Sequence, residues 1–132
     1  MPTKKRSTHK WIYAILPLTC MLAIFWLSII KAPRLYDAGN WFWDNIDKPG
    51  HSIAYASLAG TLLWAYSRFL EGLKLSMFSM VGLSSFAFLY SLLLEIVQYY
   101  LPHRTFDLWD LLANAIGIGL VTILFLRFNK DL

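Results

Sequence analysis

Long segments without any charged residue are the feature that most constrains how this chain folds. The first of them runs from Trp11 to Ile30. At about 1.5 Å of rise per residue, a helix of this length crosses the roughly 30 Å of hydrocarbon in a bilayer. Backbone polar groups find no water in that layer, so a spanning segment must satisfy them within a helix. We therefore predict a first transmembrane helix over residues 11–30, after a basic leader over residues 1–10.

Further apolar segments follow in the remainder of the chain. They predict transmembrane helices over residues 51–67, 75–101 and 108–125, the second of these three being ended by Pro102. The polar stretch over residues 31–50 contains several aromatic residues, which favour the headgroup layer. We predict that this stretch is a loop lying along the membrane surface.

The composition agrees with a membrane protein and excludes other classes. The chain is 58% hydrophobic and only 15% charged, which is too apolar for a soluble domain of this size. The net charge of +4 does not indicate nucleic acid, because the basic residues stand at the ends of apolar segments rather than along one face. The predicted fold class is an all-α membrane protein, a four-transmembrane-helix bundle. It comprises the first helix, a core with three transmembrane helices over residues 46–126 and a tail over residues 127–132.

The distribution of lysine and arginine predicts the orientation. Eight of these residues fall in the leader, in the loop between the second and third spans and in the tail, against four in the other two loops. Basic residues are enriched on the cytoplasmic side of membrane proteins. We therefore expect a multi-pass protein of the inner (cytoplasmic) membrane, with both termini in the cytoplasm.

Small residues recur along two of the predicted helices. Ser52, Ala56 and Gly60 lie four apart on the second helix, and Ala113 and Gly117 lie four apart on the fourth. Small residues let two helix backbones come close together in a membrane. We expect these faces to pack against other helices, either within the bundle or in an oligomer.

Polar and ionisable residues gather at the outward ends of the second, third and fourth predicted spans. Helical spacing places Glu95 and Gln98 on one face, and Asp110 and Asn114 on another. We predict a polar pocket at the outer mouth of the bundle. Its candidate residues are Asp47, Lys48, His51, Tyr55, Glu95, Gln98, Arg104, Asp107, Asp110 and Asn114.

Glu95 is the most informative of these residues. It lies seven residues before Pro102, about two helical turns or roughly 10 Å below the end of its span. An ionisable group at that depth costs about 3 kcal/mol on insertion scales unless it is paired or hydrated, so such residues are functional candidates. The structural alternatives are an ion pair with Arg104 or His51, or a protonated carboxyl group hydrogen-bonded to Gln98.

The remaining candidates carry weaker signals. Asp107 is suited to cap the fourth helix, and Asp110 lies in its first turn, where the helix dipole favours an acid. Arg104 offers a planar fork suited to a phosphate or a carboxylate. His51 and its acidic neighbours leave a divalent-cation site open as an alternative, with hard oxygen ligands favouring magnesium, calcium or manganese. No ligand spacing is diagnostic of a metal, so no metal or other cofactor is assigned.

The order and spacing of these residues resemble the VanZ-like family of bacterial membrane proteins. The pattern is Asp47-Lys48-x-x-His51-x-x-x-Tyr55, then Glu95-x-x-Gln98, then Arg104-x-x-Asp107-x-x-Asp110-x-x-x-Asn114-x-x-Gly117. The resemblance covers about residues 46–120 and leaves the first helix and the tail outside it. It implies a compact multi-helix membrane domain and an association of the founding member with low-level teicoplanin resistance. Resistance is not assumed for this chain, since a housekeeping role in the cell envelope is at least as well supported.

Three functions from different classes stay open. In the preferred one, the polar pocket binds or handles the headgroup of a membrane lipid or of a lipid-linked envelope precursor. In the second, an enzyme acts on a lipid phosphate at the outer face, with His51 or Glu95 as general base. Asp107 and Asp110 would then hold a metal or orient a water, and Arg104 would steady the phosphate charge. In the third, the polar residues form a self-satisfied network in a scaffold protein. The expected partners are lipids or further copies of the chain, and not nucleic acid.

Overall fold

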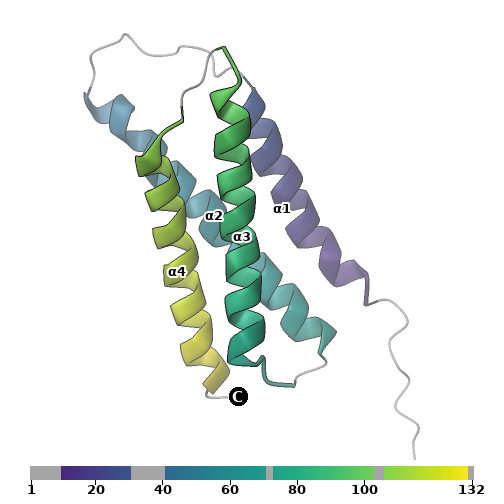
Figure 1. Cartoon of the computed structure of the whole chain (residues 1–132). Helices are drawn as coiled ribbons and strands as arrows, with labels where there is room; N and C mark the ends of the chain where they lie inside the picture. The colour runs from purple at the N-terminus through teal and green to yellow at the C-terminus, as the bar shows by residue number, and fades with distance from the viewer. Residues whose placement is uncertain (1–9, 31–40, 71–72, 103–105, 131–132) are drawn as a thin grey trace, which may run out of the picture.

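Four α-helices make up the secondary structure of the described residues. The structure is a computed structural model that describes residues 10–30, 41–70, 73–102 and 106–130, while the side chains of residues 41–47 and 129–130 lie outside the description. The helices are α1 (Ile12–Ile29), α2 (Trp41–Phe69), α3 (Met77–Tyr99) and α4 (Leu108–Lys130). Consecutive helices run in opposite directions (Figure 1). The prediction of an all-α protein with four helices is confirmed.

Three of the helices are long and apolar enough to cross a membrane, over Ile12–Ile29, Met77–Tyr99 and Leu108–Phe128. They make the chain a multi-pass membrane protein. The less apolar α2 contacts all three of the others, most extensively α4. A helix covered by apolar neighbours needs less hydropathy than one that faces lipid, and α2 contributes a large share of the core. Its buried hydrophobic residues are Tyr55, Leu58, Ala59, Leu63 and Ala65.

The start of α2 differs from the prediction. The helix begins at Trp41, ten residues before the predicted start at His51, and Pro49 lies inside it. The expectation of a loop over residues 41–50 is therefore wrong. A proline removes one backbone hydrogen bond and destabilises a helix interior, so Pro49 weakens this part of α2. The loss of one bond does not end a helix whose following turns are held by a neighbour, as they are here by α4.

The other boundaries agree more closely. α1 and α3 begin and end within two residues of their predicted limits. α4 continues from the predicted end at Phe125 to Lys130. Nothing between those residues stops a helix, because the stretch contains neither glycine nor proline. Basic residues in the last turns, Arg127 and Lys130, are also favoured by the helix dipole.

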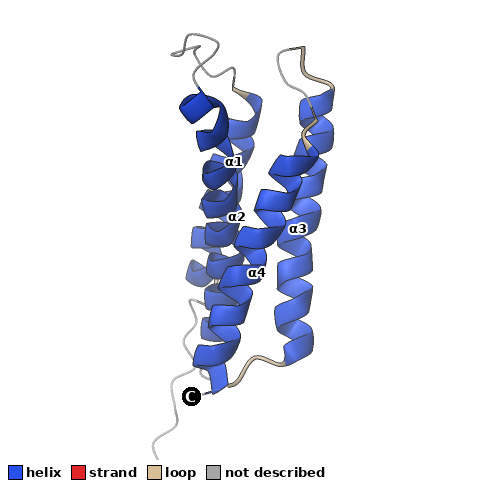
Figure 2. Cartoon of the chain, turned by 90° about the vertical axis from the view of Figure 1, so that its left-hand side faces the viewer, coloured by secondary structure: helices blue, strands red, loops and turns tan. Residues whose placement is uncertain are grey.

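The alternating directions gather four helix termini at each end of the bundle. The end of α1, the start of α2, the end of α3 and the start of α4 lie together, and we call this the polar end (Figures 1 and 2). The start of α1 and the end of α4 lie at the opposite end. The candidate residues of α2, α3 and α4 therefore fall at the same end of the molecule, as the spacing predicts.

Helices α2 and α4 approach each other closely at Gly117. A Cβ atom at this position would overlap the backbone carbonyl oxygen of Ser52 and lie 2.9 Å from its hydroxyl oxygen. About two turns further along α2, a Cβ at Gly60 would lie 3.4 Å from the side chain of Val121. The predicted packing of the small-residue faces is thus confirmed at Ser52, Gly60 and Gly117.

Replacing Gly117 should separate α2 from α4. We expect Gly117→Ala to lower the free energy of unfolding by about 1–3 kcal/mol, because backbone atoms cannot rotate out of the overlap as a side chain can. The measurement is SDS titration of detergent-solubilised protein. The matched control is Gly119→Ala on the same helix, where an added Cβ meets nothing within 4 Å. Equal stability of the two variants would contradict this account of the interface.

Candidate functional site

Three ionisable residues from three helices meet at the polar end. They are His51 of α2, Glu95 of α3 and Asp110 of α4, and one ligand-type atom from each lies within 4.8 Å of the others. His51 Nε2 is 3.6 Å from Asp110 Oδ2, and these two side chains are 16% and 14% exposed. We call this group the three-residue cluster. Because its members come from separate helices, only the assembled bundle creates it.

Glu95 is the most deeply buried member of the cluster. The residue is 2% exposed, and its Oε2 atom has no hydrogen-bond partner in the part of the chain that the structure describes. The backbone N–H of Asp107 donates to its carboxylate. A buried carboxylate oxygen without a hydrogen-bond partner lowers the free energy of unfolding, which makes Glu95 a candidate for contact with a ligand.

Asp107 and Lys48 form the outer rim of the site. Asp107 Oδ1 accepts a hydrogen bond of 2.8 Å from the backbone N–H of Trp109, which confirms its predicted capping of α4. Its other oxygen lies 3.9 Å from Lys48 Nζ, and both side chains are 36% exposed. An ion pair this exposed contributes at most about 1 kcal/mol. Capping therefore accounts for Asp107 without a catalytic role.

A second polar layer lies deeper in the bundle. Asn114 is fully buried, and its Nδ2 donates to Ser91 Oγ over 2.7 Å. Tyr55 is 3% exposed and also hydrogen-bonds to Ser91. Asn114 Oδ1 has no partner among the described residues. Sequence reasoning missed Ser91, although it lies four residues before Glu95 and therefore on the same face of α3.

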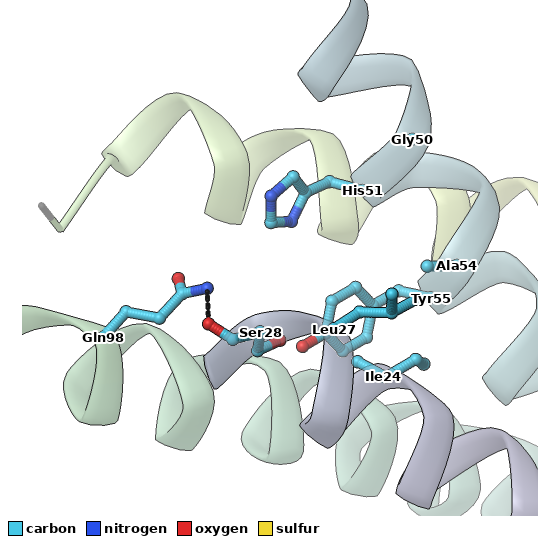
Figure 3. Close-up of a pocket in the computed structure, with 8 residues that line it drawn as sticks. All are labelled: Ile24, Leu27, Ser28, Gly50, His51, Ala54, Tyr55 and Gln98. Carbon is cyan, nitrogen blue, oxygen red and sulfur yellow. Dashed lines mark hydrogen bonds between the residues drawn. The ribbon is translucent and has the colours of Figure 1, made fainter. Parts of the chain in front are cut away.

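A cavity of about 220 Å³ lies beside the cluster. Figure 3 shows His51 and Gln98 across from one another, with Gln98 bonded to the end of α1. Gln98 Nε2 donates to the carbonyl oxygen of Ser28 over 3.2 Å. Sequence reasoning did not include Ser28, because the first helix was left outside the motif. The lining residues are Ile24, Leu27, Ser28, Gly50, His51, Ala54, Tyr55 and Gln98.

Two candidate residues from the sequence lie outside this description. The side chain of Asp47 is not among the described side chains, although its backbone belongs to α2. Arg104 lies between the described ranges that end at residue 102 and resume at residue 106. Their expected places in the pocket stay predictions. The other candidates, including Lys48, Gln98 and Asn114, all come from the polar end or the layer below it.

The fold and the cluster define a small multi-pass membrane protein whose buried acids and histidine meet at one end of a helical bundle. Its sequence matches the model of the VanZ/LLP1 family over residues 6–129, and the chain belongs to that family. The match takes in α1, which the motif resemblance over residues 46–120 had left out. Comparison with curated proteins and with solved structures gave no match.

The unpartnered oxygen of Glu95 leads to a prediction about stability. We expect Glu95→Gln to stay within about 1 kcal/mol of the wild-type free energy of unfolding in buffer with a chelator, since no hydrogen bond to Oε2 is lost. SDS titration in detergent measures it. A self-satisfied network would behave otherwise, because removal of one member of a buried ion pair costs about 3–5 kcal/mol. A loss of that size would favour the scaffold hypothesis.

Proposed function

We propose that this VanZ-family protein binds the headgroup of a membrane lipid, or of a lipid-linked envelope precursor, at its polar end. The observation that carries the proposal is the mixed wall of the 220 Å³ cavity. Ile24, Leu27 and Ala54 supply apolar surface, while His51 and Gln98 supply polar groups. A lipid shows the same change from polar to apolar groups where its headgroup meets its acyl chains.

The polar part of this wall favours recognition through hydrogen bonds. Among the residues that the structure describes, those lining the cavity include no lysine or arginine. Ser28, His51, Tyr55 and Gln98 instead offer hydroxyl, imidazole and amide groups. Groups of this kind suit sugar hydroxyls, amines and phosphate oxygens in a headgroup.

Aromatic residues support a headgroup-level position for the cavity. Tyr99, Tyr100 and Trp109 are exposed around the polar end, and Trp11 is exposed at the opposite end. Tyrosine and tryptophan gather at both membrane–water interfaces, where their rings match the change in polarity. Aromatic residues at both ends of the bundle are therefore consistent with a polar end at the level of the lipid headgroups.

The basic residues support a location as well. We place the protein in the cytoplasmic membrane with both termini in the cytoplasm, so that the polar end faces outward. Eight of the lysine and arginine residues belong to the cytoplasmic segments of that arrangement, against four in the outward loops. The ligand would then be met in the outer leaflet.

Single-cysteine labelling tests this orientation. In a Cys20→Ser background, which removes the one native cysteine, we expect Tyr100→Cys to react with a membrane-impermeant maleimide in intact cells or spheroplasts. Leu73→Cys should react only after lysis, because Leu73 is exposed at the opposite end. If only Leu73→Cys were labelled in intact cells, the protein would have the opposite orientation in the membrane.

Filling the cavity tests the binding itself. We expect wild-type protein, released in mild detergent, to retain one lipid class in native mass spectrometry, and Ala54→Leu to lose it because the added side chain occupies the cavity. Ala115→Leu is the control, since Ala115 lines a groove between α3 and α4 instead. Both variants are compared at equal yield of monodisperse protein. The same lipids in all three samples would refute binding at this cavity.

A metal-assisted reaction on a lipid phosphate is the second candidate function. The observation that favours it is the convergence of His51, Glu95 and Asp110, which combines a candidate base with acids able to hold an ion. Incubation with lipid phosphates, with and without added Mn²⁺ or Zn²⁺, tests it. Phosphate release by the wild type that is lost in His51→Gln would favour the enzyme over the binding protein.

A further inference from the structure

The three-residue cluster has the ligand types and the spacing of a metal site. We propose that His51, Glu95 and Asp110 bind one divalent transition-metal ion, of the zinc or manganese class, between α2, α3 and α4. This inference goes beyond the proposed lipid binding and does not depend on it. It rests on the distances among the three side chains and on the burial of Glu95.

The spacing within the cluster fits a single ion. Ligand atoms about 2.0–2.2 Å from a tetrahedral zinc ion lie about 3.3–3.6 Å from one another. His51 Nε2 and Asp110 Oδ2 are 3.6 Å apart. Ligand atoms of all three residues lie within 4.8 Å of one another, so one ion placed among them is near all three.

Glu95 supplies an observation independent of the clustering. The residue is 98% buried, since its exposed fraction is 2%, and its Oε2 has no hydrogen-bond partner among the described residues. Burial of the residue removes bulk water from that oxygen, which raises the cost of leaving it without a partner. A cation at the cluster would satisfy this lone oxygen and would balance the negative charge of Glu95 and Asp110.

The ligand types indicate which ions fit. An imidazole with two carboxylates suits zinc, manganese or iron, whereas magnesium and calcium prefer oxygen ligands alone. Three protein ligands leave at least one coordination position for a water molecule or another oxygen ligand. Asp107 is not included, because its carboxylate caps α4 and faces Lys48.

An ion bound by three helices should also hold them together. Each helix contributes one ligand, so binding is coupled to the assembly of α2, α3 and α4. A ligand that binds only the folded state stabilises that state in proportion to the logarithm of its concentration. Added Mn²⁺ or Zn²⁺ should therefore raise the thermal unfolding midpoint of the wild-type protein.

The test is metal binding by tag-free, chelator-treated protein in detergent. We expect the wild type to bind one Mn²⁺ or Zn²⁺ per chain, measured by Mn²⁺ electron paramagnetic resonance and by elemental analysis after desalting. Glu95→Gln and His51→Gln should bind about tenfold more weakly or worse, since loss of even an outer partner of a ligand costs about 10–100-fold. The control is Asp107→Asn, which removes a carboxylate from the same end and keeps a good capping residue.

Each outcome bears on the assignment. Loss of binding in both ligand variants with retention in Asp107→Asn supports it. No binding by the wild type, or equal binding by all four proteins, overturns it. Equal loss in Asp107→Asn would move the ion to the outer rim and overturn it as well. If Glu95→Gln does not give monodisperse protein, His51→Gln decides, because this side chain is partly exposed and its replacement leaves the core intact.

Discussion

Helices in lipid gain little from hiding apolar side chains from one another, so close contact between backbones must hold them together. The contact between Gly117 and the backbone of Ser52 meets that need in this bundle. It also positions the candidate site. His51 directly precedes Ser52, and Asp110 lies two turns before Gly117 on the same face of α4. The absence of a side chain at Gly117 therefore sets the distance between two members of the three-residue cluster.

Glu95 opposes the stability that this packing provides. A buried carboxylate oxygen without a hydrogen-bond partner lowers the stability of the bundle, and nearby leucines show that apolar residues fit the same helix. Conflicts of this kind between local environment and residue type concentrate at functional sites. The deeper pairing of Asn114 with Ser91 differs, because its donor is satisfied and it ties α3 to α4. One polar layer thus contributes to cohesion, while the other contains the buried Glu95 oxygen that has no hydrogen-bond partner among the described residues.

Much of the fold was predictable because a long apolar segment in lipid must satisfy its backbone hydrogen bonds within a helix. Helical spacing and the alternating directions of the helices were enough to predict that Glu95 and Asp110 lie at the same end of the bundle. The start of the second helix was predicted wrongly, because the polar and aromatic residues over 41–50 indicated a surface loop, whereas α2 begins at Trp41 and packs on α4. Ser91 and Ser28 were missed because a serine in an apolar run gives no signal until its partner is known. The convergence of His51, Glu95 and Asp110, with ligand atoms within 4.8 Å of one another, depends on the packing of three helices and cannot be read from spacing along one helix.

The modest hydropathy of α2 has a consequence for how the protein is made. Entry of a helix into the bilayer from the translocon depends on its own apolarity. By length and composition, α1, α3 and α4 are apolar enough to cross a membrane, and α2 is less apolar than these three. Its principal neighbour, α4, follows α2 and α3 in the chain and therefore emerges later from the ribosome. The most extensive contact of α2 can therefore form only after α2 and α3 have been synthesised, so the packing that covers this less apolar helix is established late in the synthesis of the bundle.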